Sequence, residues 1–349
     1  MKDSIKNYYL EEAEDIFERL GEARYRARQL FSWLYAKNVA SFEEMSNYSK
    51  ELRSKLEEEF SVSPLDLEER LLSKIDGTEK FLFKTEDGHF IESVLLRNEA
   101  SDDGRLTICI SSQIGCAMGC TFCSTAKIGF IRNLTVAEIL DQIIHVRRAT
   151  GLLNNNIVFM GMGEPFNNYD NVIKAANIMN YSFGFHISVR KITISTCGIL
   201  PAIKRYVQEK HLFNLAISLN DSDPALRKIN MPVENKYPIK EIAAFINKNP
   251  AAGYNRMTLE YVMRKDNISK KNAEEIKKLF KFAHVMLNLI PLNSPECPDK
   301  KDIDKFMQYC SIMNIPIIVR KSLGSDISGG CGQLAGKKYS GGSGEIIEV

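Results

Sequence analysis

The spacing of apolar residues predicts that the chain begins with helices. In residues 1–70 apolar side chains recur every three or four positions, most clearly over 25–37, where they form one stripe of an amphipathic helix. Ser49 suits the N-cap of a further helical run, and Pro64 ends that run. We therefore expect a small helical accessory domain over residues 1–70.

The apolar period then changes from helical to strand-like. Residues 80–84 and 89–96 read as two strands joined by Asp-Gly at 87–88, a pair typical of hairpin turns, so a β-hairpin extension is expected over 71–104. Glu92 lies inside the second apolar run, where a buried carboxylate would need a partner or a function. A solvent-facing place on an edge strand is an equally good interpretation of Glu92.

From residue 105 onward strand-like and helix-like segments alternate, which indicates parallel β/α units. Thr135, with Glu138 three residues further on, predicts a capping box at the start of the first of these helices. We count six main units, too few for a closed eight-stranded barrel, and therefore expect an α/β fold with a partial (β/α)6 barrel over 105–321. The remaining tail, 322–349, is rich in glycine and serine and is expected to be flexible. The predicted strands are 105–112, 156–161, 191–195, 212–219, 256–263, 285–291 and 316–320.

Composition places the protein among soluble globular proteins. Of its 349 residues 44% are hydrophobic and 26% charged, and the net charge of +2 permits a nucleic-acid partner without demanding one. Basic residues cluster locally, for example at Arg24, Arg26 and Arg28, although such clusters are most often solvated helix faces. We see no secretory leader and no membrane-spanning run, and therefore expect a cytoplasmic protein without a membrane partner.

Three of the eight cysteines form the strongest motif in the chain. Cys116, Cys120 and Cys123 have the spacing C-x3-C-x2-C just after a predicted strand. In a long chain without a secretory signal, cysteines favour metal or redox chemistry over a disulfide framework. Three thiolates can hold three irons of a [4Fe–4S] cluster, and the open fourth iron can bind the amino and carboxylate groups of S-adenosylmethionine. The alternatives are ordinary loop cysteines or half of a zinc site.

Small polar residues follow several of the predicted strands. In a parallel barrel the chemistry gathers at the carboxyl ends of the strands. Gly163 and Glu164 follow the second strand; glycine lets a ligand approach the backbone, and the carboxylate can accept a hydrogen bond from the amine of S-adenosylmethionine. Taken singly, polar residues at strand ends are most often loop caps. The later candidates are Ser195 after the third strand, Ser218, Leu219 and Asn220 after the fourth, and Asn293 after the sixth.

Two of the five cysteines outside the triad are further candidates for chemistry. Cys109 is on the predicted strand that precedes it, and Cys331 is in the glycine-rich tail. One cysteine on a rigid strand and one on a flexible loop can work as a pair in nucleophilic and disulfide chemistry. A buried free cysteine that acts as a small apolar residue is the commoner situation, and Cys197, Cys297 and Cys310 are assigned to it.

Taken together, these motifs resemble a known family. The cysteine triad and the segment Gly-Met-Gly-Glu-Pro at 161–165 are similar to the radical S-adenosylmethionine superfamily. Four longer strings, which begin at Cys109, Phe122, Arg132 and Cys331, narrow the resemblance to the RlmN/Cfr family of RNA adenine methyltransferases. The resemblance extends over nearly the whole chain, including its N-terminal region.

Carried over residue by residue, the resemblance implies a radical methyltransferase that acts on C2 of adenosine in 23S rRNA and in tRNA. The cysteine triad would hold a [4Fe–4S] cluster, and the strand-end residues named above would bind S-adenosylmethionine. Cys331 would carry the methyl group, Cys109 would resolve it through a transient disulfide, and Glu92 would accept a proton. The resemblance further implies a monomer, an electron donor such as flavodoxin, and RNA contacts through the helical domain.

The chain departs from the family pattern at one candidate position. The family usually has histidine where Asn220 stands, and asparagine can form hydrogen bonds but cannot titrate. Ser124 and Pro165 favour the C2 reaction over the C8 reaction of the Cfr branch. A C8-methylating enzyme and a non-enzymatic iron–sulfur redox sensor remain as alternatives.

Overall fold

The first region of the chain is helical, as the apolar spacing predicts. The computed structural model describes residues 2–97, 106–153, 156–249, 257–281, 285–291, 297–320, 323–337 and 345–347. The predicted stripe is buried, including Ala27, Leu30 and Phe31. The elements of this region are β1 (Asp3–Ser4), η1 (Ile5–Asn7), α1 (Leu10–Arg19), α2 (Tyr25–Phe31), the π-helical η2 (Ser32–Ala36), η3 (Phe42–Glu44), α3 (Lys50–Glu59) and β2 (Phe60–Ser61), and β1 pairs with β2 in parallel.

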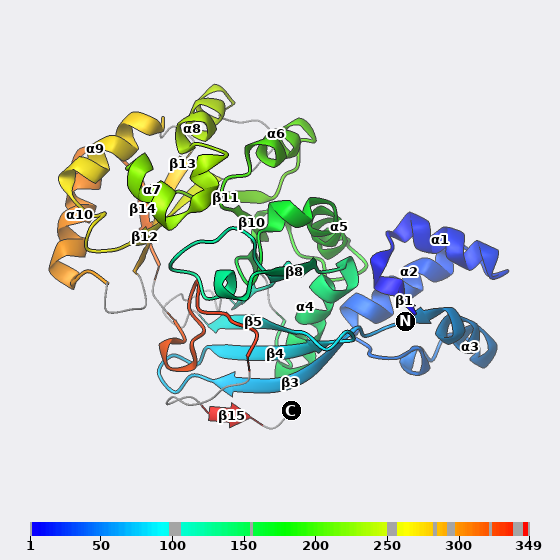
Figure 1. The fold of residues 1–349 in the computed structure, drawn as a ribbon. Helices are drawn as coiled ribbons and strands as arrows, with labels where there is room; N and C mark the ends of the chain where they lie inside the picture. Colours follow the sequence, from blue (N-terminus) through cyan, green and yellow to red (C-terminus); the bar gives the residue numbers. More distant parts are fainter. Residues whose placement is uncertain are drawn as a thin grey trace.

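An antiparallel extension follows, drawn in cyan in Figure 1. The predicted hairpin is confirmed, and Gly88 in its turn has a φ of +83°, which glycine adopts without strain. The strands are β3 (Leu65–Leu72), β4 (Glu79–Thr85), β5 (Phe90–Arg97) and, from the tail, β15 (Glu345–Ile347), which pairs with β3.

Strand β3 is absent from the sequence-based prediction, and the domain boundary expected at residue 70 falls inside it. A bulge between Leu67 and Glu69 interrupts the pairing of β3 with β4. Because the bulge also interrupts the alternation of apolar and polar residues, the segment does not read as a strand. The helical region therefore ends before β3, and the extension has three consecutive strands instead of two.

Seven parallel strands continue the same sheet in chain order, from β6 next to β5 to β14 at the far edge. Each of the first six is followed by at least one helix, and this arrangement confirms the partial barrel of six β/α units. The strands are β6 (Leu106–Cys109), β9 (Asn156–Phe159), β10 (Ile192–Thr196), β11 (Asn214–Ser218), β12 (Met257–Met263), β13 (Val285–Pro291) and β14 (Ile317–Val319). The helices are α4 (Val136–Thr150), α5 (Tyr169–Asn180), α6 (Leu200–Gln208), α7 (Pro224–Asn230), α8 (Ile239–Lys248), α9 (Lys270–Leu279) and α10 (Lys300–Ile312).

Helix α4 joins the helical region to the barrel. It begins with the predicted capping box, in which the Thr135 hydroxyl accepts from the Glu138 backbone N–H. Lys6 and Asp141 form a fully buried ion pair between η1 and α4. Burial alone would raise the pKa of Asp141, but Lys6 and His145 lower it to about 2. Within the described ranges, no helix combines the length and the apolar content needed to cross a membrane.

The tail is docked where the sequence predicts flexibility. In residues 323–337 the Gly324 N–H donates to Asp76 at 2.8 Å, and the Asp326 carboxylate accepts from the Ser73 hydroxyl at 2.7 Å. Both partners lie in the connection between β3 and β4. The glycine-rich segment therefore packs tightly against the extension. This packing carries the tail past the ends of the barrel strands.

Candidate active site

A cavity of about 680 Å³ lies inside the barrel and extends to the loops at the carboxyl ends of its strands. It is lined by segments that are far apart in the sequence: residues along β6 and β9 to β14, the loops after β6 and β9, and the tail. The candidate residues that line it are Cys109, Cys116, Cys120, Cys123, Gly163, Glu164, Ser195, Ser218, Asn220 and Cys331. The structure thus brings most of the predicted site residues together.

The loop that carries the cysteine triad is closed at its base by two short strands, β7 (Gln113–Gly115) and β8 (Phe130–Asn133), which pair in antiparallel fashion. Gly115 has a φ of +69°, and a Cβ there would lie 1.7 Å from the Gly129 carbonyl oxygen. The Cys116 N–H donates to the same carbonyl at 2.9 Å. Only glycine at position 115 permits this close approach, so the first cysteine of the triad is fixed by the backbone.

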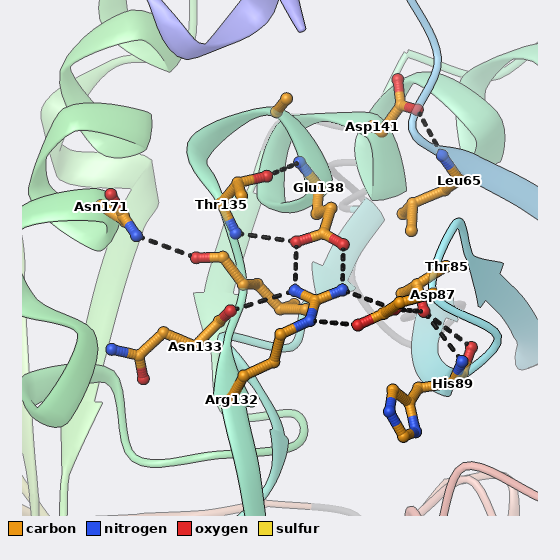
Figure 2. A network of polar contacts seen from close by, with 12 residues as sticks. Leu65, Thr85, Asp87, His89, Arg132, Asn133, Thr135, Glu138, Asp141 and Asn171 are labelled. Atoms are coloured by element: carbon orange, nitrogen blue, oxygen red, sulfur yellow. Dashed lines mark hydrogen bonds and ion pairs between the residues drawn. The ribbon is translucent and has the colours of Figure 1, made fainter. Parts of the chain in front are cut away.

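Arg132 ties the base of this loop to the rest of the fold, as Figure 2 shows. Its guanidinium donates to Asp87 of the β4–β5 turn at 2.7 Å and to Glu138 of α4 at 2.7 Å. The hydrogen bond from Arg132 holds the pKa of Asp87 well below its usual range. The predicted hairpin turn and the predicted capping box therefore both take part in positioning the triad.

The three thiols have the chemistry and the space that an iron–sulfur cluster needs. Burial raises the pKa of Cys116 to about 11 and that of Cys120 to about 12, and the neighbouring thiols add to both shifts. Thiolates held so close together in a buried site require a compensating cationic group. No three His, Cys, Asp or Glu side chains in the described ranges are grouped to hold a single metal ion. Soft ligands around an open space fit a cluster of several irons.

Glu164 links the loop after β9 to two of its neighbours. Its carboxylate accepts from the Phe166 N–H at 3.0 Å and from the Cys197 N–H at 2.8 Å, and its own N–H donates to Gln113 at 2.8 Å. Burial raises the pKa of this carboxyl above its ordinary value, although the hydrogen bonds oppose the shift. Gly163 has a φ of +102°, and a Cβ there would lie 2.6 Å from the Gln113 Cβ.

The other strand-end candidates have different surroundings. Ser195 and Ser218 line the cavity, whereas Leu219 is fully buried in the core. Asn220 has a φ of 54°, which asparagine tolerates better than most residues. Its side-chain oxygen Oδ1 accepts a hydrogen bond from the Val262 N–H at 3.1 Å. The Asn220 side chain therefore bridges β11 and β12 as well as facing the cavity. Asn293 lies outside the described residues.

Cys331 reaches the cavity because the segment that follows it is held by the loop directly after the cysteine triad. The Gly332 carbonyl accepts from the Ser124 N–H at 2.7 Å, and the Leu334 carbonyl accepts from the Thr125 hydroxyl at 2.7 Å. Cys331 is exposed, whereas Cys109 is buried, and burial raises the pKa of Cys109 to about 12. All eight cysteines are free thiols, and the disulfide that the family resemblance implied is not supported.

Glu92 is buried against the tail segment that follows Cys331. Its side chain is outside the set of residues that line the described cavity. One carboxylate oxygen accepts from the Ala335 N–H at 2.6 Å and from the Gly336 N–H at 3.0 Å, and the other pairs with Lys80 at 3.1 Å. The buried alternative for Glu92 is thus confirmed over the solvent-facing one, and the carboxylate anchors the tail.

Two buried cations next to the site, Lys80 and Arg227, were not predicted from the sequence. Lys80 lies on β4, one diagonal step from Glu92, because Leu82 pairs with Glu92 and Lys80 with Val94. The sequence signal for this pair is that Lys80 and Glu92, of opposite charge, each lie inside an otherwise apolar strand of the same hairpin. Arg227, on α7, hydrogen-bonds to strand ends, and no local pattern indicated this contact.

Two protein-family models match parts of the chain. Residues 5–62 match the ribosomal RNA large subunit methyltransferase N-terminal domain, and residues 110–283 match the radical SAM superfamily. The dual-specificity RNA methyltransferase RlmN of Pelobacter propionicus is 43% identical over 342 residues, covering 96% of this chain and 96% of its own. The chain belongs to the RlmN family. The probable RlmN of Clostridium novyi is 40% identical and covers 95% of this chain and 97% of its own.

A solved structure supports the same conclusion. A radical SAM methyltransferase from Sphaerobacter thermophilus is similar with a TM-score of 0.88 and 37% identity, over 96% of this chain and 100% of that one. Membership of the RlmN family confirms the resemblance seen in the sequence and the radical SAM barrel. The radical SAM superfamily implies a [4Fe–4S] cluster and S-adenosylmethionine in general.

Proposed function

We propose that the chain methylates C2 of adenosine in 23S rRNA and in tRNA by way of a methylated Cys331. The observation that carries the proposal is that the cavity wall includes Cys331 and Cys109 together with the cysteine triad. A radical SAM protein that only senses redox state would need the triad but neither of the other two cysteines. The relatives are named dual-specificity RNA methyltransferases, which supports more than one kind of RNA substrate.

Each candidate residue then has a separate role. Cys116, Cys120 and Cys123 would hold the cluster, which supplies the electron for reductive cleavage of S-adenosylmethionine when bound. Gly163, Glu164, Ser195, and the Ser218–Leu219–Asn220 strand end, with Asn293, would hold S-adenosylmethionine. Leu219 would contribute through its backbone, because its side chain is in the core.

Cys331 would accept the methyl group, since it is the exposed thiol of the cavity. Cys109 would later attack the Cys331 sulfur, so that a transient disulfide forms while the bond between that sulfur and the transferred carbon breaks and the product leaves. Because no disulfide joins these two cysteines, the tail has to shift for the two sulfur atoms to meet. Glu92 would accept a proton, as the family resemblance implies, and its protonation would weaken the hydrogen bonds from the Ala335 and Gly336 N–H groups that it accepts.

RNA binding and the remaining partners follow from the family alone. The arginines of the helical region offer less free charge than the sequence indicates, because Arg24 pairs with Asp15 and Glu18 at 2.9 and 2.7 Å. Phosphate contacts would therefore depend on other basic residues as well. We further propose a cytoplasmic monomer reduced by an external donor such as flavodoxin.

The test is an anaerobic assay of the reconstituted enzyme with RNA transcripts, followed by mass spectrometry of the nucleosides. The expected product is 2-methyladenosine, and Cys331→Ala should abolish it while reductive cleavage of S-adenosylmethionine continues. Cys297→Ala is the control, since Cys297 is partly buried away from the described cavity wall. 8-Methyladenosine would establish the C8 reaction instead, and no cleavage of S-adenosylmethionine would favour the redox sensor.

A further inference from the structure

Arg227 is a fully buried arginine next to the cavity, and neither the sequence motifs nor the comparisons give it a role. It lies on α7, after the fourth barrel strand. Its guanidinium donates to three backbone carbonyls: Cys197 at 2.9 Å, Ser218 at 3.1 Å and Leu219 at 3.0 Å. The first carbonyl directly follows β10, and the other two lie at the end of β11, so one side chain joins two adjacent strand ends.

A carboxylate accounts for the charge of this arginine. Glu234, in η7 (Pro232–Asn235), is buried and accepts a hydrogen bond from Arg227 as well as one from the Ile239 N–H at 2.9 Å. A buried ion pair is tolerated when its donors and acceptors are satisfied, and here the planar guanidinium meets four acceptors. Gly198, which has a φ of +114°, lies beside it: a Cβ there would be in ordinary contact with the guanidinium at 3.6 Å but only 2.7 Å from the Ile242 side chain.

The helix that carries Arg227 also contacts the cluster loop. The Thr121 N–H donates to the Asn230 carbonyl at 3.0 Å, and the Thr121 hydroxyl contacts the Asn230 side chain at 3.1 Å. On the other side of Cys120, a Cβ on Gly119 would lie 3.5 Å from the Pro232 ring. The end of α7 and the start of η7 therefore touch the cluster loop on the two sides of Cys120.

From these contacts we propose that Arg227 is a positioning residue that sets the spacing between the cluster loop and the strand ends of β10 and β11. The inference rests on the proposed function, in which Ser195 and Ser218 hold S-adenosylmethionine while Cys120 holds the cluster. S-adenosylmethionine would have to contact both parts at once. A shift of either part relative to the other would weaken its binding even in a protein that is folded and loaded with its cluster.

The test compares Arg227→Met with Arg227→Lys in anaerobically reconstituted protein. Methionine keeps the length of the side chain but removes all four donated hydrogen bonds, whereas lysine keeps the charge without the planar fork. We measure iron content, equilibrium binding of radiolabelled S-adenosylmethionine, and the electron paramagnetic resonance spectrum of the reduced cluster with and without S-adenosylmethionine. At equal iron content, Arg227→Met should bind about tenfold or more weakly, and Arg227→Lys should be intermediate.

Arg147→Met is the matched control. Arg147 is also buried, but it lies in the last turn of α4, packs on Phe185 at 4.8 Å, donates to the Tyr35 carbonyl and is not among the residues that line the cavity. This control should lower the melting temperature and leave binding of S-adenosylmethionine within about twofold. Both kinds of arginine variant can lose stability, but only the Arg227 variants should lose the spectral change that S-adenosylmethionine causes.

The outcomes separate this inference from the proposed function. If the unchanged protein fails to bind S-adenosylmethionine, the proposed function is wrong. If the unchanged protein binds it and loaded Arg227→Met binds equally well, Arg227 has no positioning role. Should Arg227→Met give no soluble protein, Arg227→Lys decides, and a lysine variant that also fails to fold would assign Arg227 to the stability of the fold alone.

Discussion

Glu92 and Glu164 are two buried carboxylates that each accept two backbone hydrogen bonds, yet they are held in different ways. Glu92 faces a lysine, and the N–H groups it accepts come from the tail, more than 240 positions away. Glu164 forms no ion pair among the described residues, and its acceptor oxygens bind the backbone of Phe166 and Cys197 within the barrel. Glu92 is thus held with a compensated charge, whereas Glu164 is held by hydrogen bonds alone.

The difference shows how each part of the site is kept in place. An ionised carboxylate forms stronger hydrogen bonds than a neutral one, and Lys80 keeps Glu92 in an environment where charge is tolerated. That strength is needed because the tail is held only at separate points along residues 323–337. Glu164 joins loops that are already fixed by adjacent parallel strands, so weaker links are sufficient there.

Lys80→Met should have the largest effect on stability. It removes the partner of a carboxylate that is 1% exposed, and breaking a buried pair in this way costs about 3–5 kcal/mol. The free energy of unfolding, measured by urea titration, should fall by that amount. The double variant Lys80→Met/Glu92→Gln should recover part of the loss, since it leaves no buried charge. A single variant within about 1 kcal/mol of the unchanged protein would refute the importance of the pair.

Glu164→Ala should have a smaller effect. It leaves the N–H groups of Phe166 and Cys197 buried without an acceptor, which costs about 2–4 kcal/mol in total. Glu164→Gln keeps one carbonyl oxygen and should lose about half as much. Urea titrations of both variants provide the measurement. Equal losses for the two would mean that charge, and not hydrogen bonding, is what matters at this position.

The barrel can be predicted well from the sequence because the features that specify it depend on residues that are close together in the chain. Alternating strands and helices, the Thr135 capping box and the turn at Gly88 each depend on neighbouring residues, and the structure confirms them. The triad spacing likewise identified the cavity wall. The docking of the tail could not be predicted, because it depends on contacts such as Ser73 with Asp326, which are 253 positions apart. A bulge hid β3 for the opposite reason, since it broke a local pattern.

The pH dependence of stability should test the surroundings of Glu164. Burial raises the pKa of Glu164, so its neutral form is favoured in the folded protein. The stability this contributes is complete below the ordinary glutamate pKa, about 4.3, and is lost as the pH rises through the raised value. The free energy of unfolding of Glu164→Gln, relative to the unchanged protein, should therefore increase from pH 4 upward. A difference that stays constant with pH would contradict the raised pKa.

The smallest effect on global stability is expected for Gly336→Ala, which acts on the tail alone. Gly336 has a φ of +57°, and a Cβ there would lie 2.6 Å from the Phe90 carbonyl oxygen, next to the N–H that Glu92 accepts. Gly88→Ala is the matched control, since Gly88 also has a positive φ but a Cβ there meets nothing within 4 Å. Both variants incur the backbone cost of about 1–2 kcal/mol, but only Gly336→Ala adds a clash. If the Glu92 contacts hold the Cys331 loop, limited proteolysis should cut the tail of Gly336→Ala faster than that of Gly88→Ala. Equal cleavage rates would mean that the loop is held elsewhere, at Ser124 and Thr125.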